Sequence, residues 1–238
     1  MIREHAFNSA WWGEKVGFVE DAALFTLPAA ERDAILGEYA WVEYVAPIDT
    51  VAPDALLRTG FMQTDVQIVF KLDLRRLPSL PDFANLTVAS AAEQPFHIGD
   101  DELGEFEHER FRYLPGITPA KLKDRYRLWA NTLIDANPDW SLRIAHEGTV
   151  QGWFLSEQDA KGFHLTLAAL HRDATVSGLL LYQQALATYA QRGQRVGGAR
   201  FSVANPPVHN IYAHLGARFL SPYGCWLWLR PPAPSTHG

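Results

Sequence analysis

Two long amphipathic helical patterns, set among short apolar runs, constrain the fold of this chain more than any other feature. Residues 119–135 carry an apolar stripe at helical spacing, which predicts a helix with one buried side. Residues 177–192 repeat this pattern, and Gly193 follows as a suitable C-terminal cap. The apolar stripe of the first helix consists of Leu122, Tyr126, Trp129 and Leu133.

Short runs rich in β-branched and aromatic residues surround these helices and predict strands. Glu147-Gly148-Thr149 lies between two of them and predicts a hairpin turn. Further helices are expected at 100–112 and 207–215. The order β-α-α-β-β-β-α-β-α-β predicts an α/β layer on a mixed sheet. The expected strands are 86–89, 140–146, 150–156, 163–170, 199–204 and a closing pair at 219 and 223–229.

A proline-rich break at 75–82 divides the chain, because two prolines within four residues discourage regular structure. The part before the break alternates strand-like runs (16–19, 39–46, 65–74) with helix-like runs (29–36, 53–60). We therefore expect an N-terminal α/β part at 1–76, a linker at 77–85, a larger domain at 86–230 and a tail at 231–238.

Composition excludes several classes of protein. The chain has 238 residues, a formal net charge of −6 and no block of Lys or Arg, so we expect no nucleic-acid partner. The single cysteine, Cys225, forms neither an intrachain disulfide nor a cysteine zinc site. No apolar run has the length of a membrane span, and the acidic start is unlike a signal peptide. A cytoplasmic protein is expected, with a homodimer left open.

The loop at 171–177 is the first chemical candidate, because it joins a strand to the start of a long helix. A helix N-terminus offers unpaired N–H groups and a partial positive charge, which together suit a phosphate. An ordinary strand-to-helix connection is the alternative. His209 and His214 are five residues apart and do not fit a His-Glu-x-x-His metal motif, so no metal is expected.

Residues 205–219 resemble the signature of the GNAT acyltransferases, and the resemblance extends over about 86–230. It implies a GNAT-like mixed central sheet with flanking helices, preceded by a smaller degenerate GNAT-like α/β half in which 56–61 echo the end of the motif. The segment with Arg110 and Phe111, and the helix with Trp129, resemble the dTDP-fucosamine (nucleotide-amino-sugar) acetyltransferase type. The signature positions are Asn205, Val208, Ile211, Tyr212, Leu215 and Gly216.

The resemblance implies an N-acetyltransferase that moves an acetyl group from acetyl-CoA, as co-substrate, directly to a primary amine of a small molecule, with an amino-sugar nucleotide as the suggested acceptor. Tyr212 would be the general acid, and the oxyanion donor a backbone N–H at a strand bulge near 168–170. Substrate-side residues would be Arg110, Phe111, Trp129 and His164. Residues implied to bind acetyl-CoA are Ala168, Ala169, Leu170, Arg172, Thr175, Val176, Ser177, Gly178, Leu179, Asn205 and Tyr212.

The general base stays open among Glu107, His108 and His164. The phosphate loop departs from the family pattern Gln/Arg-x-x-Gly-x-Gly/Ala, because Val176 replaces the first glycine and Asp173 the basic or amide residue. Valine narrows the approach of a phosphate, and aspartate repels it. The alternatives are therefore a GNAT-fold protein that binds acyl-CoA or another ligand without catalysis, an acyltransferase with a different donor, and a structural partner in a complex.

Overall fold

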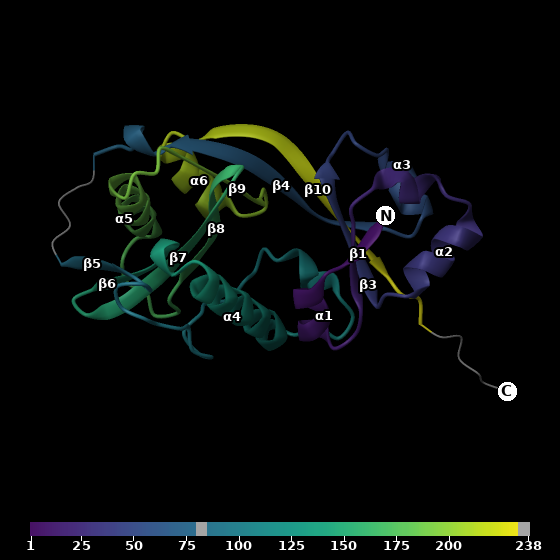
Figure 1. Cartoon of the computed structure of the whole chain (residues 1–238), viewed down its shortest axis with the longest axis horizontal. Helices are drawn as coiled ribbons and strands as arrows, with labels where there is room; N and C mark the ends of the chain where they lie inside the picture. The colour runs from purple at the N-terminus through teal and green to yellow at the C-terminus, as the bar shows by residue number, and fades with distance from the viewer. Residues whose placement is uncertain (80–84, 233–238) are drawn as a thin grey trace. The chain divides into compact units, whose positions relative to one another are not determined.

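The computed structural model describes residues 1–79 and 85–232 (Figure 1). Within these residues, contacts define two compact units. The first unit comprises 1–67, 113–115 and 221–232, and the second comprises the described parts of 68–112 and 116–220. The strands β4 (Met62–Asp73) and β10 (Arg218–Leu229) each contribute to both units.

The predicted domains 1–76 and 86–230 divide the chain differently, because they assign all of β10 to the second part. The proposed linker 77–85 and tail 231–238 fall largely outside the described residues.

The first unit is a small sheet with short helices. Its strands are hydrogen-bonded in the order β1-β2-β3-β10, with β2 and β3 parallel and the other two pairs antiparallel. Its core gathers apolar side chains from both helices and strands, including Leu24, Leu36, Val42 and Phe61. The elements are β1 (Ile2–Glu4), α1 (Ala6–Trp12), β2 (Val16–Val19), η1 (Ala22–Thr26), α2 (Ala29–Gly37), β3 (Trp41–Pro47) and α3 (Pro53–Arg58).

The second unit is built on strands in the order β4-β9-β8-β7-β6-β5. The pairs from β5 to β8 are antiparallel, whereas β8 and β9 are parallel. The sheet is therefore mixed, as the element order predicts. Its elements are η2 (Leu74–Arg76), β5 (Leu86–Ser90), η3 (Arg110–Tyr113), α4 (Pro119–Ala136), η4 (Pro138–Trp140), β6 (Ser141–His146), β7 (Thr149–Asp159), β8 (Gly162–Leu170), α5 (Gly178–Gln191), β9 (Val196–Ser202) and α6 (Pro206–His214).

Helices cover both faces of this second sheet, as alternation along β7 makes clear. Phe154 belongs to a core shared with α5 and α6, while Trp153 and Leu155 belong to a core shared with α4. Since neighbouring side chains of a strand point to opposite faces, α5 and α6 pack on one face and α4 on the other. The N-terminal ends of α4 and α6 are capped by Thr118 and Asn205.

Most predicted elements are confirmed, with ends shifted by a few residues. The helix predicted at 100–112 is wrong, because this acidic segment has only the short η3 at its end. Gly104 interrupts the segment, and Leu103 forms an antiparallel bridge with His171 while its side chain is buried against α4. Burial of scattered apolar side chains, rather than a helical stripe, orders this stretch. The sequence patterns also missed β1 and α1.

The hairpin turn between β6 and β7 provides a test of local strain. Gly148 has a φ of +80°, and nothing lies within 4 Å of a Cβ placed there. We expect Gly148→Ala to lower the free energy of unfolding by about 1 kcal/mol, because only backbone strain opposes it. Denaturant unfolding measures this change. Gly148→Asn is the control and should cost less, since Asn tolerates left-handed backbone; equal stability of Gly148→Ala and the parent chain would contradict the expectation.

Candidate functional site

Strands β8 and β9 separate within the second sheet. They pair only at Phe163 with Gly197 and at His164 with Gly198, although β8 continues to Leu170 and β9 to Ser202. All residues of both strands are described, so beyond these two pairs each strand has an edge without a β-ladder to the other. An edge of this kind inside a sheet leaves backbone groups for another partner.

The hydrogen bonds of β8 indicate which of its backbone groups face this edge. The His171 N–H donates to the Gln151 carbonyl at 2.9 Å, in register with the β7–β8 ladder. Because antiparallel bonding alternates, Ala169 also turns its N–H and C=O toward β7. Ala168 and Leu170 therefore turn theirs toward the separated edge. At the end of this edge the Arg172 N–H donates to the Glu102 carbonyl at 2.8 Å, and Leu103 bridges to His171.

The bulge of β8 lies earlier than expected. The register with β7 is regular from Gly152–Leu170 to Leu155–Leu167 and then shifts by one before Glu157 pairs with His164. Leu165 and Thr166 thus face the single residue Ser156, which is the arrangement of a β-bulge. The expectation of a bulge near 168–170 is wrong, because Ala168, Ala169 and Leu170 lie in the regular part of the ladder.

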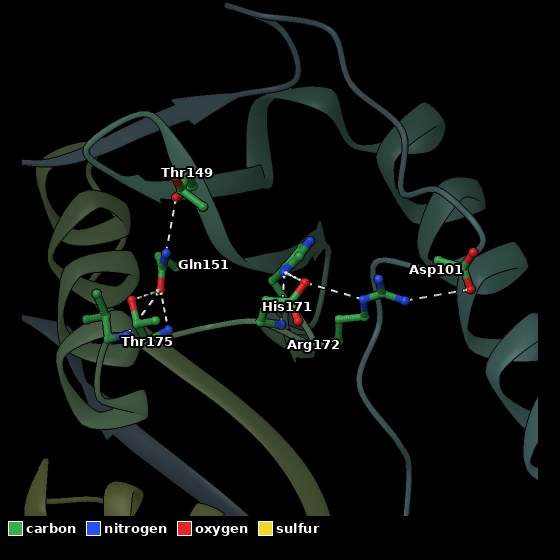
Figure 2. Close-up of polar contacts among 8 residues, drawn as sticks. Asp101, Thr149, Gln151, His171, Arg172 and Thr175 are labelled. Carbon is green, nitrogen blue, oxygen red and sulfur yellow. Dashed lines mark hydrogen bonds and ion pairs between the residues drawn. The ribbon is translucent and has the colours of Figure 1, made fainter.

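The loop between β8 and α5 has an internal partner for its backbone donors, as Figure 2 shows. Gln151 of β7 accepts at its Oε1 atom the N–H of Thr175 at 2.8 Å and the N–H of Val176 at 3.1 Å. The Thr175 hydroxyl lies 3.4 Å from the same oxygen. The N–H groups of Thr175 and Val176, two of the residues implied to bind acetyl-CoA, are therefore paired within the chain.

The start of α5 is packed against apolar side chains. Val176 is only 8% exposed and belongs to the core under α5 and α6. A Cβ at Gly178 would lie 3.5 Å from Ile211 and 3.8 Å from Leu170. Ser177 precedes the helix without a side-chain cap bond, and Gly178 and Leu179 have no acceptor within the helix because they belong to its first turn.

The charges around the loop are mainly negative. Arg172, one of the residues implied to bind acetyl-CoA, forms ion pairs with Asp173 at 3.3 Å and with Asp101 at 3.9 Å (Figure 2). His171 accepts the Asp173 N–H at its Nδ1 atom. One arginine therefore faces two carboxylates, and the loop has no surplus positive charge for a dianion.

Tyr212 of α6 is buried among aromatic rings. Its ring centroid lies 4.0 Å from Phe70, 5.7 Å from Phe201 and 5.4 Å from Tyr182. Burial raises the pKa of the Tyr212 phenol well above its usual value, and the neighbouring tyrosines raise it further. The phenol therefore stays protonated at neutral pH. Asn205, predicted to bind the co-substrate, accepts the Val208 N–H at 3.2 Å and caps α6.

The predicted substrate-side residues Arg110, Phe111 and Trp129 come together around Arg125. The Arg125 guanidinium lies 4.5 Å from the Phe111 ring centroid and 5.8 Å from that of Trp129, and the Arg110 guanidinium lies 4.5 Å from the Phe111 ring. Arg125 is a buried cation that the sequence patterns missed. Its position three residues after Leu122 on the buried side of α4 was the available signal.

Glu109 is a second buried charge next to this cluster. It is 3% exposed, accepts the Phe111 N–H at 3.1 Å and accepts the Tyr126 hydroxyl. Glu107 and His108, two of the three candidate bases, are exposed instead. The third, His164, lies where β8 and β9 meet and bonds to Asp159 at 3.0 Å, and this bond lowers the pKa of Asp159.

In residues 1–79 and 85–232, no group of three or more His, Cys, Asp or Glu side chains is arranged to hold a metal ion. None of the helices described is both long and apolar enough to cross a membrane.

No protein-family model matches the sequence, and no curated protein matches it. Solved structures do match. A GCN5-related N-acetyltransferase from Sphaerobacter thermophilus gives a TM-score of 0.61 at 15% identity, over 98% of this chain and 76% of that chain. A tandem GNAT protein from the clavulanic acid biosynthesis pathway gives 0.53 at 12% identity, over 93% and 77%. A glucosamine N-acetyltransferase region of a fungal multi-domain β-N-acetylglucosaminidase gives 0.59 at 11% identity, over 91% and 30%.

At these identities the likeness shows the fold alone. The chain has the mixed α/β fold of the GNAT N-acetyltransferases, with helices flanking the sheet, as the resemblance implies. The match to a tandem protein agrees with a GNAT-like half in the N-terminal part. The dTDP-fucosamine type of specificity does not follow from these matches.

The buried tyrosines provide a test that uses their titration. Burial raises the pKa values of Tyr44, Tyr182, Tyr189 and Tyr212 in the folded chain. As the pH rises past about 10, the unfolded chain loses these protons first, so the free energy of unfolding should fall in alkaline solution. Phenolate absorbance should show early- and late-titrating groups, and Tyr212→Phe should reduce only the late amplitude. A reduced early amplitude would contradict the burial of Tyr212.

Proposed function

We propose that this chain transfers an acyl group from a pantetheine thioester, of the acyl-CoA kind, to a primary amine of a small molecule. The separation of β8 and β9 beyond His164 and Gly198 is the observation that carries the proposal. The GNAT fold supports it in general, because the matched structures include N-acetyltransferases.

The separated edge of β8 suits the elongated arm of such a donor. Pantetheine contains two amides, and an extended chain of amides can pair with a free strand edge as an added strand does. Ala168 and Leu170 turn their backbone groups toward this edge. A backbone N–H there is also a fitting donor to the oxyanion that forms when an amine attacks the thioester.

The reaction needs no covalent intermediate on the protein. The neutral amine forms a C–N bond to the acyl carbon, the C–S bond breaks, the amine gives up a proton to a base or water, and the thiolate takes one. The Tyr212 phenol is always protonated at neutral pH because burial raises its pKa. It is a weaker acid than a thiol, whose pKa is about 8.5, so its main contribution is a hydrogen bond to the leaving sulfur.

An amino-sugar nucleotide is the acceptor that we propose within this class. Arg110 and Trp129 are half-buried beside the fully buried Phe111, so they supply a cation and an aromatic face in one cluster, which suits a phosphorylated ring compound. One matched structure includes a region described as a glucosamine N-acetyltransferase. At 11% identity it supports an amino sugar only as a candidate to assay first.

Binding without catalysis is the second candidate function. The hydrogen bonds that the Thr175 and Val176 N–H groups donate to Gln151, and the carboxylates of Asp173 and Asp101, favour it, because a donor whose phosphate is disfavoured at the start of α5 would bind without the placement that transfer needs. Calorimetry with acetyl-CoA and turnover on a panel of primary amines separate the two. Binding without turnover supports the second candidate, whereas turnover supports the first.

Tyr212→Phe tests the proposed hydrogen bond to the leaving sulfur. We expect turnover of acetyl-CoA with an accepted amine to fall at least tenfold, since loss of one preorganised donor to developing charge typically costs ~100-fold or more. Release of free thiol measures this rate. Acetyl-CoA affinity should change little.

Tyr189→Phe is the matched control, because the Tyr189 hydroxyl donates to the carbonyls of Phe154 and Trp140 and has a structural role. It should lower stability by about 1–2 kcal/mol and leave turnover unchanged. Unchanged turnover in Tyr212→Phe would remove Tyr212 from the mechanism.

A further inference from the structure

The carboxamide of Gln151 binds the backbone N–H groups of the loop that leads into α5. Gln151 is 1% exposed, so this side chain lies inside the second unit. Its Oε1 atom accepts two consecutive backbone N–H groups, from Thr175 and Val176, and lies near the Thr175 hydroxyl (Figure 2). A single oxygen held by these donors stands where a phosphate oxygen would accept them.

Gln151 is also fixed from its other end. Its Nε2 atom donates to the Thr149 carbonyl at 3.3 Å, and its backbone carbonyl accepts the His171 N–H at 2.9 Å. Both ends of the carboxamide therefore have partners on described elements. To open the loop, a ligand would have to replace several bonds of a buried polar group, which is unfavourable unless all of them are restored.

The charged side chains in and near the loop also disfavour a phosphate. Asp173 and Asp101 share Arg172, whose guanidinium is thereby engaged on the protein itself. A pyrophosphate at this point would approach two carboxylates and only one arginine. Valine at 176 adds a buried side chain where the family pattern has glycine. Three features thus disfavour a phosphate here, while none of them bears on the backbone of β8 at Ala168, where β8 has no ladder to β9.

We propose that Gln151 is a specificity-determining residue that replaces a donor phosphate, so that this chain recognises its thioester donor by the pantetheine arm and not by the pyrophosphate. The inference rests on the proposed function and adds the chemical class of the donor. Compounds with a free or simply substituted pantetheine should serve as well as acetyl-CoA.

Calorimetry of the full chain with acetyl-CoA and with S-acetylpantetheine, which has no phosphate, tests this inference. We expect the parent chain to bind the two donors with dissociation constants within about threefold of each other. Gln151→Ala should lower the dissociation constant of acetyl-CoA at least about tenfold, because it frees two N–H groups for a phosphate oxygen. The dissociation constant of S-acetylpantetheine should not change. Inorganic pyrophosphate should then raise the melting temperature of this variant but not that of the parent chain.

Two further variants serve as controls. Gln158→Ala removes an exposed glutamine of the same strand, which bonds to Gln194 and not to the loop, and should change neither affinity. Gln151→Glu keeps an oxygen acceptor in place and adds a negative charge, so it should not tighten acetyl-CoA. Gln151→Glu also keeps the inference testable if Gln151→Ala fails to fold. If no phosphate binds at this point, the added charge should raise the dissociation constant of acetyl-CoA no more than that of S-acetylpantetheine.

The outcomes separate the two proposals. If the parent chain binds acetyl-CoA more than about tenfold tighter than S-acetylpantetheine, the inference about Gln151 is overturned while the acyltransferase proposal stands. Weaker acetyl-CoA binding by Gln151→Ala, in a folded variant, also overturns it. If neither thioester binds the parent chain or Gln151→Ala, the proposed function fails together with the inference.

Discussion

The second unit depends on a sheet that stops pairing in its middle. Backbone N–H and C=O groups need hydrogen-bond partners, and the pairing of β8 with β9 ends after only two residue pairs. Neighbouring elements contact the strands where this pairing ends. Residues 102–103 add a bridge and a hydrogen bond at the end of β8, and α5 and α6 pack over one face beside the separated strands. The backbone of β8 at Ala168, between the last β8–β9 pair and this bridge, is the part of the edge on which the proposed function depends.

Periodicity was sufficient to predict the elements that carry a regular apolar stripe. α4 and α5 and the β6–β7 hairpin were found within a few residues, because each buries one side at its own spacing. Residues 100–112 do not form the predicted helix, since an acidic composition alone indicates exposure and Gly104 interrupts the segment. This segment is held in place by Leu103 and Phe111, which distant parts of the chain bury. Local sequence patterns do not predict such contacts.

The candidate site was only partly predictable. The signature residues identify α6 and Tyr212. Arg110, Phe111 and Trp129, which the resemblance assigns to one substrate side, lie together around Arg125. Gln151 was not found, because its partner Thr175 lies 24 residues away and a glutamine in a strand has no distinctive local pattern. The buried ions Glu109 and Arg125 were missed for the same reason: charged residues are read as exposed unless their partners are known.

The loop at 171–177 departs from the family pattern, yet specific hydrogen bonds hold it. If Val176 and Asp173 had merely replaced residues that were no longer needed, the loop N–H groups would be left to water. Instead a buried carboxamide from another strand accepts two of them, and its own amide group is held in turn by Thr149. A buried polar side chain is stable only when its bonds are satisfied, so Gln151, Thr175 and Val176 form one interdependent set. The loop N–H groups of Thr175 and Val176 are thus satisfied by the chain itself, whereas β8 has no ladder to β9 beyond His164, and the two features place different demands on any ligand.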